Sequence, residues 1–212
     1  FNSDDRKPNY NFDPKIIVEN AKSTKGYSEI ALYFNQLKKN YNKDRLVITF
    51  DYYHGIDKKE VEEKLISKLN ADLIIDTSVA EYPPEKINDK FGMFITEHRV
   101  NGVTSPCFAK EFFDPDLVLK LNDKIKETSG LVILHGTCAS VIQKGDILVN
   151  GILTKDEARS RIDKGLDNWG AKNFDEDGTR KEKRSSFLDF PVLDKHKRHI
   201  LKDADYVIDF LC

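Results

Sequence analysis

The turn after an apolar stretch at residues 45–53 carries the first group of residues whose types suggest chemistry. It contains His54, Gly55, Asp57 and Lys58, directly ahead of a stretch with helical spacing. A phosphate-binding loop occupies such a strand-to-helix turn, and its pattern GxxxxGK[ST] supplies glycines for close backbone approach and a lysine and a hydroxyl for the terminal phosphate and magnesium. This turn has one glycine and lacks GK[ST]. Two interpretations follow: an altered anion site at a helix N-terminus, or a plain turn whose Asp57 caps the helix.

A second group follows the apolar run at residues 131–134. His135, Gly136 and Thr137 lead into Cys138-Ala139-Ser140, and small residues at this place allow close approach of a ligand or of another backbone. One interpretation is a loop that lines a ligand site, and the other is a packed turn around an inert buried thiol. Catalysis by Cys138 with His135 would need a positioned base and a third, orienting group, which this pattern does not supply.

A basic tract toward the C-terminus is the third group. Arginine forks match phosphate oxygens, and a cationic lid over an anion site is an arrangement that phosphoryl chemistry uses. Interspersed carboxylates favour the other interpretation, a solvated face. The five histidines show no metal-ligand spacing such as HExxH, so no metal is expected in this chain. The residues predicted to contact phosphate are Arg159, Lys183, Arg184, His196 and Arg198.

Strand and helix patterns alternate along the sequence and would position these groups. Apolar strands without polar alternation are typical of a sheet covered by helices on both faces, which predicts an α/β fold with a mainly parallel sheet of about five strands. Parallel strands end at one edge, so the three groups are expected to converge there on an anion. Strands are predicted at 15–19, 45–53, 71–77, 131–134, 146–150 and 205–210, and helices at 27–39, 57–69, 115 to about 125, 155 to about 166, and in the basic segment ahead of the last strand.

The organisation predicted from these patterns is a short arm followed by one domain. Residues 1–14 are polar and aperiodic, which predicts an extended arm, and residues 15–212 are predicted to form a single α/β domain. Asp114 and Thr154 are expected helix caps, and Pro83-Pro84 is expected to break the chain's regular structure. The segment at about 168–188 is polar, mixed in charge and weakly periodic, so we expect a polar, basic lid or surface excursion there.

The composition excludes several classes of function. Lys and Arg number 34 against 36 Asp and Glu, so the net charge is −2 and the basic excess typical of nucleic-acid binding is missing. No apolar run approaches the roughly 20 residues that span a bilayer. Three cysteines without CxxC spacing suggest a reducing compartment, so we expect a cytoplasmic protein. The sequence leaves the oligomeric state open.

Several motifs resemble a known family. The series NWG, RKEKRSSF, DKHKR and DYVID at residues 168–209, with the turn at 53–57, the loop at 135–140 and GDILV at 145–149, is similar to the N-terminal, kinase-like region of long bacterial class I mannose-6-phosphate isomerases. The order of elements resembles uridine-kinase-like P-loop folds more distantly. This resemblance implies a P-loop-kinase-like sheet with a degenerate phosphate loop. It also implies an associated cupin domain, which would carry the isomerase activity and the zinc.

These observations together predict a non-catalytic or ancillary domain that binds a phosphorylated sugar or nucleotide and is associated with a mannose-6-phosphate isomerase. Whether the chain is itself an enzyme is left open. An active small-molecule phosphotransferase with a non-standard phosphate loop is one alternative, and the missing GK[ST] counts against it. A structural or oligomerisation module that binds nothing is the other. The expected partner is a phosphorylated small molecule, and no cofactor, membrane or nucleic acid is expected.

Overall fold

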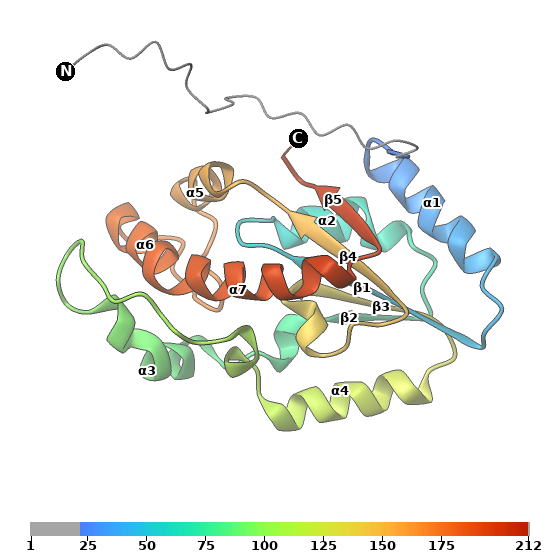
Figure 1. Cartoon of the computed structure of the whole chain (residues 1–212), viewed down its shortest axis with the longest axis horizontal. Helices are drawn as coiled ribbons and strands as arrows, with labels where there is room; N and C mark the ends of the chain where they lie inside the picture. Colours follow the sequence, from blue (N-terminus) through green and yellow to red (C-terminus); the bar gives the residue numbers. More distant parts are fainter. Residues whose placement is uncertain (1–21, 212) are drawn as a thin grey trace, which may run out of the picture.

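The computed structural model describes residues 22–211. The arm predicted at 1–14 and the strand predicted at 15–19 lie outside these residues. The described chain forms a five-stranded sheet in the order β2-β3-β1-β4-β5, and every neighbouring pair is parallel. Its helices and strands are α1 Tyr27–Lys39, β1 Arg45–Tyr52, α2 Lys58–Lys64, β2 Leu73–Asp76, α3 Pro84–Ile95, α4 Pro115–Glu127, β3 Gly130–Thr137, β4 Ile147–Ile152, α5 Lys155–Asp163, α6 Gly178–Arg184, α7 Phe190–Ile200 and β5 Tyr206–Asp209 (Figure 1).

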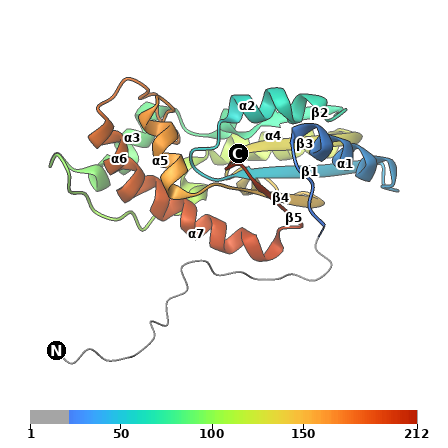
Figure 2. The same ribbon diagram turned by 90° about the horizontal axis from the view of Figure 1, so that it is seen from above.

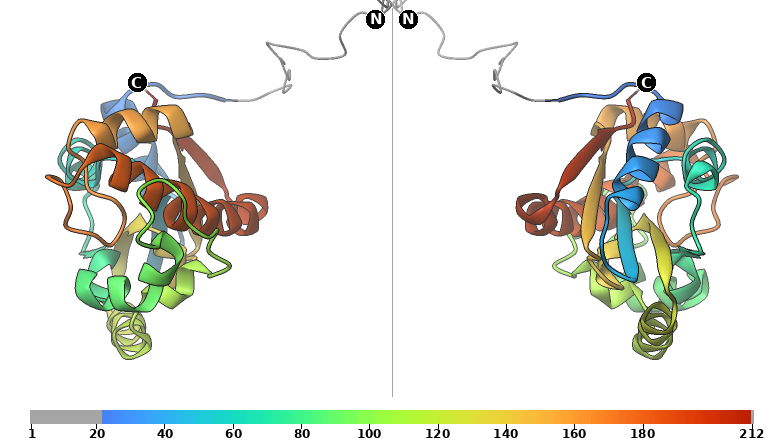
Figure 3. Two further views of the ribbon diagram at one scale, coloured as in Figure 1. Left: turned by 90° about the vertical axis from the view of Figure 1, so that its left-hand side faces the viewer. Right: turned by 90° about the vertical axis from the view of Figure 1, so that its right-hand side faces the viewer.

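Helices cover both faces of this sheet, which explains the unbroken apolar strands. Helices α1 and α2 lie on one face and α7 on the other (Figures 2 and 3). Strand β1 is buried from Leu46 to its end, and β3 from Leu131 to Gly136. A strand covered on one face only would alternate buried and exposed residues. These two central strands are instead buried at consecutive positions, so both of their faces are covered. The predicted α/β class with helices on both faces is confirmed.

Local sequence signals set the starts of several helices. The Asp114 carboxylate accepts hydrogen bonds from the backbone N–H groups of Asp116, at 3.0 Å, and Leu117, at 3.4 Å, at the start of α4. The Thr154 hydroxyl accepts one from the Glu157 N–H, at 3.3 Å, at the start of α5. Both predicted caps are therefore confirmed.

Helix α3 is absent from the sequence prediction. Pro83-Pro84 was expected to break regular structure, but Pro84 is the first residue of α3. Proline is well suited to this position because its missing N–H would have no partner in the first turn of a helix. The apolar side of α3 buries Ile87 and Phe91.

The segment at 168–188 differs from the predicted surface excursion. Lys181, Lys183 and Arg184 of α6 expose only 2%, 5% and 4% of their surface. A π-helical turn at Ser185–Asp189 then joins α6 to α7 without a break (Figure 1). The prediction of an exposed basic lid is therefore wrong for these three side chains. They can be buried because hydrogen bonds inside the protein replace those that they would make to water.

Buried hydrogen bonds explain how such a polar segment can be packed. The Lys181 ammonium donates to the Ile162 carbonyl at 2.8 Å, and the Asn168 amide donates to the Asp189 carboxylate at 2.8 Å. Polar composition therefore misled the prediction, since composition records the presence of polar groups and gives no information on their partners. Among residues 22–211, no helix is both long enough and apolar enough to cross a membrane.

Candidate functional site

The turn after β1 is packed closed. His54 exposes 2% of its surface, and Gly55 has φ +81°. A Cβ atom at Gly55 would lie 2.6 Å from the Ala158 Cα of α5, so the turn touches α5 directly. Asp57 caps α2 by accepting from the N–H groups of Lys59, at 3.0 Å, and Glu60, at 3.2 Å. The amides that an anion would need already have a carboxylate acceptor, which favours the plain-turn interpretation.

The Lys58 and His54 side chains of this turn also have partners inside the protein. The Lys58 ammonium donates to the Asp76 carboxylate at 2.6 Å and to the Ser78 hydroxyl at 2.9 Å. The His54 Nε2 lies 3.3 Å from the Ser185 hydroxyl and 3.4 Å from the Asp189 carboxylate, and burial lowers the pKa of His54. Neither side chain is left to meet a ligand in this arrangement.

The loop after β3 is also packed. His135 is fully buried, and neither of its ring nitrogens has a hydrogen-bond partner among residues 22–211. A Cβ at Gly136 would lie 2.2 Å from the Thr77 hydroxyl oxygen, so this position has room for glycine alone. Thr137 is half-buried and ends β3. Cys138 is fully buried in a left-handed conformation, and burial raises the pKa of its thiol well above the ordinary value. This thiol stays protonated, which agrees with the packed-turn interpretation.

Asp51, which the sequence prediction missed, joins this loop to α7. Its Oδ2 accepts from the Ser140 N–H at 2.8 Å, from the Ser140 hydroxyl at 2.6 Å, and lies 2.9 Å from the His196 Nε2. The same Nε2 is 3.2 Å from the Ser140 hydroxyl. A single nitrogen cannot donate to the carboxylate and accept the serine proton at once, so the cluster is a structural tie rather than a nucleophile with its base. An aspartate inside an otherwise apolar strand was the available signal.

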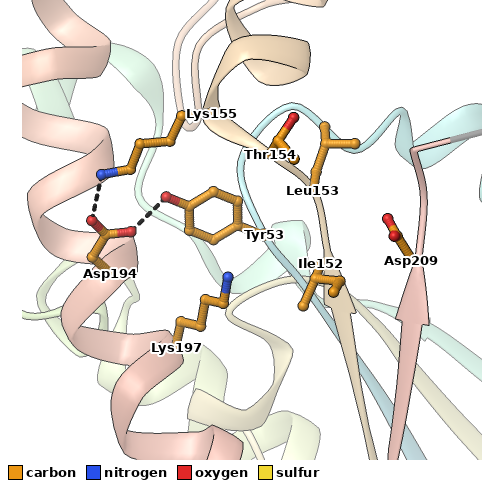
Figure 4. A pocket seen from close by; sticks show the side chains of 8 residues that line it. All are labelled: Tyr53, Ile152, Leu153, Thr154, Lys155, Asp194, Lys197 and Asp209. Atoms are coloured by element: carbon orange, nitrogen blue, oxygen red, sulfur yellow. Dashed lines mark hydrogen bonds and ion pairs between the residues drawn. The ribbon is translucent and has the colours of Figure 1, made fainter. Parts of the chain in front are cut away.

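A small pocket lies at the carboxyl ends of β4 and β5, beneath the start of α5 (Figure 4). We call it the α7 pocket; its volume is about 270 Å³. The Asp194 carboxylate accepts from the Tyr53 hydroxyl and from the Lys155 ammonium, both at 2.6 Å. Burial alone would raise the pKa of Asp194, but these two hydrogen bonds outweigh it and the pKa is lowered. The residues that line the α7 pocket are Tyr53, Ile152, Leu153, Thr154, Lys155, Asp194, Lys197 and Asp209.

A larger cavity of about 530 Å³ separates α3 from α6, beyond the carboxyl ends of the strands. We call it the α3–α6 cavity. Two predicted phosphate-binding residues, Lys183 and Arg184, line it together with Arg180. Its five cationic side chains are Arg99, Lys172, Arg180, Lys183 and Arg184, and its three carboxylates are Glu85, Glu97 and Glu176.

The cationic side chains of the α3–α6 cavity divide into two kinds. Lys183 donates to the carbonyls of Thr96, at 3.0 Å, and of His98, and thereby fixes the loop after α3. Arg184 donates to the Asn88 side chain at 2.9 Å and to the Trp169 carbonyl at 3.0 Å. Arg99, Lys172 and Arg180 are exposed, so their charges can reach a ligand.

The remaining predicted phosphate contacts lie outside the α3–α6 cavity. Arg159 pairs with Glu182 at 2.9 Å, and His196 belongs to the Asp51 tie described above. Arg198 is exposed on α7. The predicted residues are therefore distributed over several places and do not converge on one anion. Within the described part of the chain, no group of three or more His, Cys, Asp or Glu residues is placed to hold a metal ion.

Glu81, near the strand ends, has a strongly perturbed carboxyl group. Burial raises its pKa to about 7, against the lowering effect of the hydrogen bond from the Trp169 indole at 2.9 Å. The Trp169 ring in turn stacks on Phe112, with ring centroids 4.2 Å apart. Charging Glu81 is therefore unfavourable in the folded protein, and deprotonation opposes folding.

Glu81→Gln is expected to stabilise the protein at high pH only. The parent loses stability as pH rises from about 4.5 through 7, because the folded-state pKa lies above the ordinary value. Gln keeps an acceptor for the indole and cannot charge, so we expect a gain of about 1–2 kcal/mol at pH 8 and almost none at pH 4.5. Urea unfolding at both pH values measures it. The titration of His54 acts on stability in the opposite direction, but it is common to both proteins and cancels from their difference. An equal difference in stability at both pH values would contradict the raised pKa of Glu81.

The arrangement of strands and helices is similar to that of a solved structure. The fold is a five-stranded parallel α/β fold, and it is similar to that of a "putative fructose transport system kinase" from Silicibacter sp. TM1040, with a TM-score of 0.50. The two sequences are 14% identical, over 84% of this chain and 97% of that one, so the likeness concerns the fold alone.

The family is shown by a sequence model. The chain belongs to the family described as Domain of unknown function (DUF8485), whose model matches residues 26–210. A search among curated proteins gives no match. The kinase-like fold implied by the sequence resemblance is thus supported, whereas none of the comparisons supports a relation to mannose-6-phosphate isomerases.

Proposed function

We propose that this chain binds a phosphorylated small molecule in the α3–α6 cavity. The observation that carries the proposal is the charge of the cavity wall: five cations face three carboxylates in a protein whose net charge is −2. Among residues 22–211, Arg99 and Lys172 have no ion-pair partner, and exposed Arg180 has only the loose pair with Glu176 on the same wall, at 3.8 Å. Guanidinium groups match the oxygens of a phosphate. A volume of about 530 Å³ is within the range of small-molecule sites.

The rest of the cavity wall favours a sugar phosphate over a nucleotide. Carboxylates and amides accept and donate the hydrogen bonds that sugar hydroxyl groups need, and Glu85, Glu97 and Asn88 can provide them. The buried Asn173 amide donates to Glu176 at 2.9 Å and to Asn168 at 2.9 Å, so it has no bond left for a ligand. A nucleobase is usually held against an aromatic or other flat apolar surface. Among the described lining residues, only His98 has an aromatic ring.

The packed turn after β1 supports binding without phosphoryl transfer. A kinase holds its nucleotide phosphates with backbone amides and a lysine in the loop after such a strand. Here the Asp57 side chain accepts hydrogen bonds from the backbone amides, and the Asp76 carboxylate accepts one from Lys58. We therefore expect no phosphoryl transfer from ATP at rates typical of kinases, about 1–100 per second. A coupled assay with magnesium, ATP and a panel of sugars and nucleosides tests this, and turnover in that range would favour the phosphotransferase alternative.

Thermal melting with matched phosphates tests the binding proposal. Ribose 5-phosphate at about 100 times its dissociation constant should add about 2.7 kcal/mol of stability, or about 5–10 °C in melting temperature. AMP, which adds a base to the same sugar phosphate, should bind more weakly. Arg180→Gln should weaken the binding of ribose 5-phosphate by about tenfold or more, since the substitution removes a charge-assisted hydrogen bond.

Two control variants locate the effect. Lys164→Gln removes an exposed charge outside the α3–α6 cavity and should leave binding unchanged. Arg198→Gln tests the anion site predicted from sequence at the carboxyl edge of the sheet. A loss of binding in this variant but not in Arg180→Gln would favour that site over the α3–α6 cavity. If no phosphate compound raises the melting temperature, the structural-module alternative replaces this proposal.

An ancillary role beside a cupin isomerase domain is the finer part of this proposal. It rests on the motif resemblance at 168–209 and on no feature of the α3–α6 cavity. Purified chain added to a mannose-6-phosphate isomerase reaction should change the response of the enzyme to sugar phosphates if the association is real, and an unchanged response would remove it.

A further inference from the structure

We propose that the α7 pocket binds a small zwitterion with an apolar side chain, of the kind represented by a free α-amino acid. The pocket lies at the ends of parallel strands, where open α/β sheets commonly bind ligands: Ile152 ends β4 and Asp209 ends β5 (Figure 4). It is separate from the α3–α6 cavity, with which it shares no lining residue.

Two of the four charged groups in the α7 pocket neutralise each other. The Asp194 carboxylate accepts hydrogen bonds from the Lys155 ammonium and from the Tyr53 hydroxyl, both at 2.6 Å. The charges of Asp194 and Lys155 therefore compensate each other. A ligand would gain little from either, because it would have to break a short ion pair that already has its hydrogen bonds. The charge available to a ligand is therefore that of the other two groups.

Those two groups are Lys197 and Asp209, and they are not paired. The Lys197 ammonium makes no hydrogen bond or ion pair with residues 22–211, and its nearest aromatic contact is the Tyr53 ring, 5.0 Å from the centroid. The Asp209 carboxylate accepts from the Leu211 N–H at 3.0 Å and has no cation within ion-pair distance in the same part of the chain. One pocket thus offers one free positive and one free negative group.

The space between these charges is apolar. Figure 4 shows Ile152 between Lys197 and Asp209, with Leu153 above it. A ligand carboxylate can pair with Lys197 and a ligand ammonium with Asp209, while a short aliphatic side chain covers Ile152 and Leu153. A volume of about 270 Å³ suits a ligand of this size, and a phosphate dianion would find only one free cation.

Calorimetric titration with L-leucine and two truncated analogues tests this proposal. 4-Methylpentanoic acid lacks the ammonium group and 3-methylbutylamine lacks the carboxylate. Each should bind about tenfold or more weakly than leucine, because one charge-assisted contact is missing. Equal affinity of either analogue, or no binding of any of the three, would overturn the proposal.

Single variants assign each charge of the ligand. Lys197→Met should weaken the binding of leucine and of 4-methylpentanoic acid but not that of 3-methylbutylamine. Asp209→Asn should weaken the binding of leucine and of 3-methylbutylamine but not that of 4-methylpentanoic acid. Lys202→Met removes an exposed cation outside the pocket and should change none of the three affinities. Asp209 is exposed and Lys197 is half-buried, and neither has an ion-pair partner among residues 22–211. Circular dichroism and melting should therefore show native folding of both variants. Because Arg180→Gln should leave leucine binding unchanged, failure of this proposal is separable from failure of the α3–α6 cavity.

Discussion

Replacing Asp189 by alanine is expected to lower the free energy of unfolding by about 3–5 kcal/mol. Asp189 is fully buried, and its carboxylate faces the Arg184 guanidinium at 3.7 Å and accepts from the Asn168 amide at 2.8 Å. Alanine would leave the buried Arg184 charge without a counter-charge and the amide without this acceptor. Urea unfolding of parent and variant at pH 7 measures the loss.

A matched exposed pair provides the control for this measurement. Asp156 lies 3.4 Å from Arg159 on α5, but its side chain is 98% exposed. Asp156→Ala should change stability by less than about 0.5 kcal/mol, since water screens exposed ion pairs. Similar losses in the two variants would mean that Asp189 is exposed in solution, and would favour the exposed lid predicted at about 168–188.

Replacing Gly55 by alanine is expected to cost about 2–4 kcal/mol of stability. Part of the cost is backbone strain, because φ of +81° is unfavourable for any residue with a Cβ. The rest is steric: the new Cβ would lie 2.6 Å from both Cα and Cβ of Ala158. The variant therefore tests whether the turn after β1 is packed against α5 or open around a ligand.

Gly26 separates the two contributions. It has φ +88°, close to that of Gly55, but a Cβ there would have no atom within 4 Å. With φ +88° and ψ 146°, Gly26 lies in a region that almost only glycine occupies, so Gly26→Ala should show a backbone cost alone, about 1–3 kcal/mol. Equal losses at Gly26 and Gly55 would show that Gly55 has free space beside it, and the closed turn would have to be abandoned.

The sheet and several helix starts could be predicted because their signals are local. The apolar run at 45–53 contains β1, and the caps at Asp114 and Thr154 lie within three residues of the amides they bind. The missed helix α3 also has a local explanation, since Pro84 begins a helix as readily as it ends one. The strand predicted at 15–19 remains untested.

The candidate sites could not be predicted because they depend on contacts between distant residues. Asp51 and His196 are 145 positions apart, and Arg184 reaches Asn88 across 96. No pattern in the sequence distinguishes the buried Lys183 from the exposed Arg180 three positions earlier. Only the packing of α6 against α3 shows which basic residues are free to meet a ligand.

Backbone NMR of the parent chain during titration with ribose 5-phosphate tests the central claim most directly, because each amide reports its own surroundings. If the α3–α6 cavity is the binding site, the amide shifts that move should cluster at residues 84–99 and 171–184, and those of the turn at 53–58 should stay in place. Shifts concentrated at 53–58 and 135–140, with the α3–α6 amides unmoved, would place the phosphate at the strand ends and contradict this account.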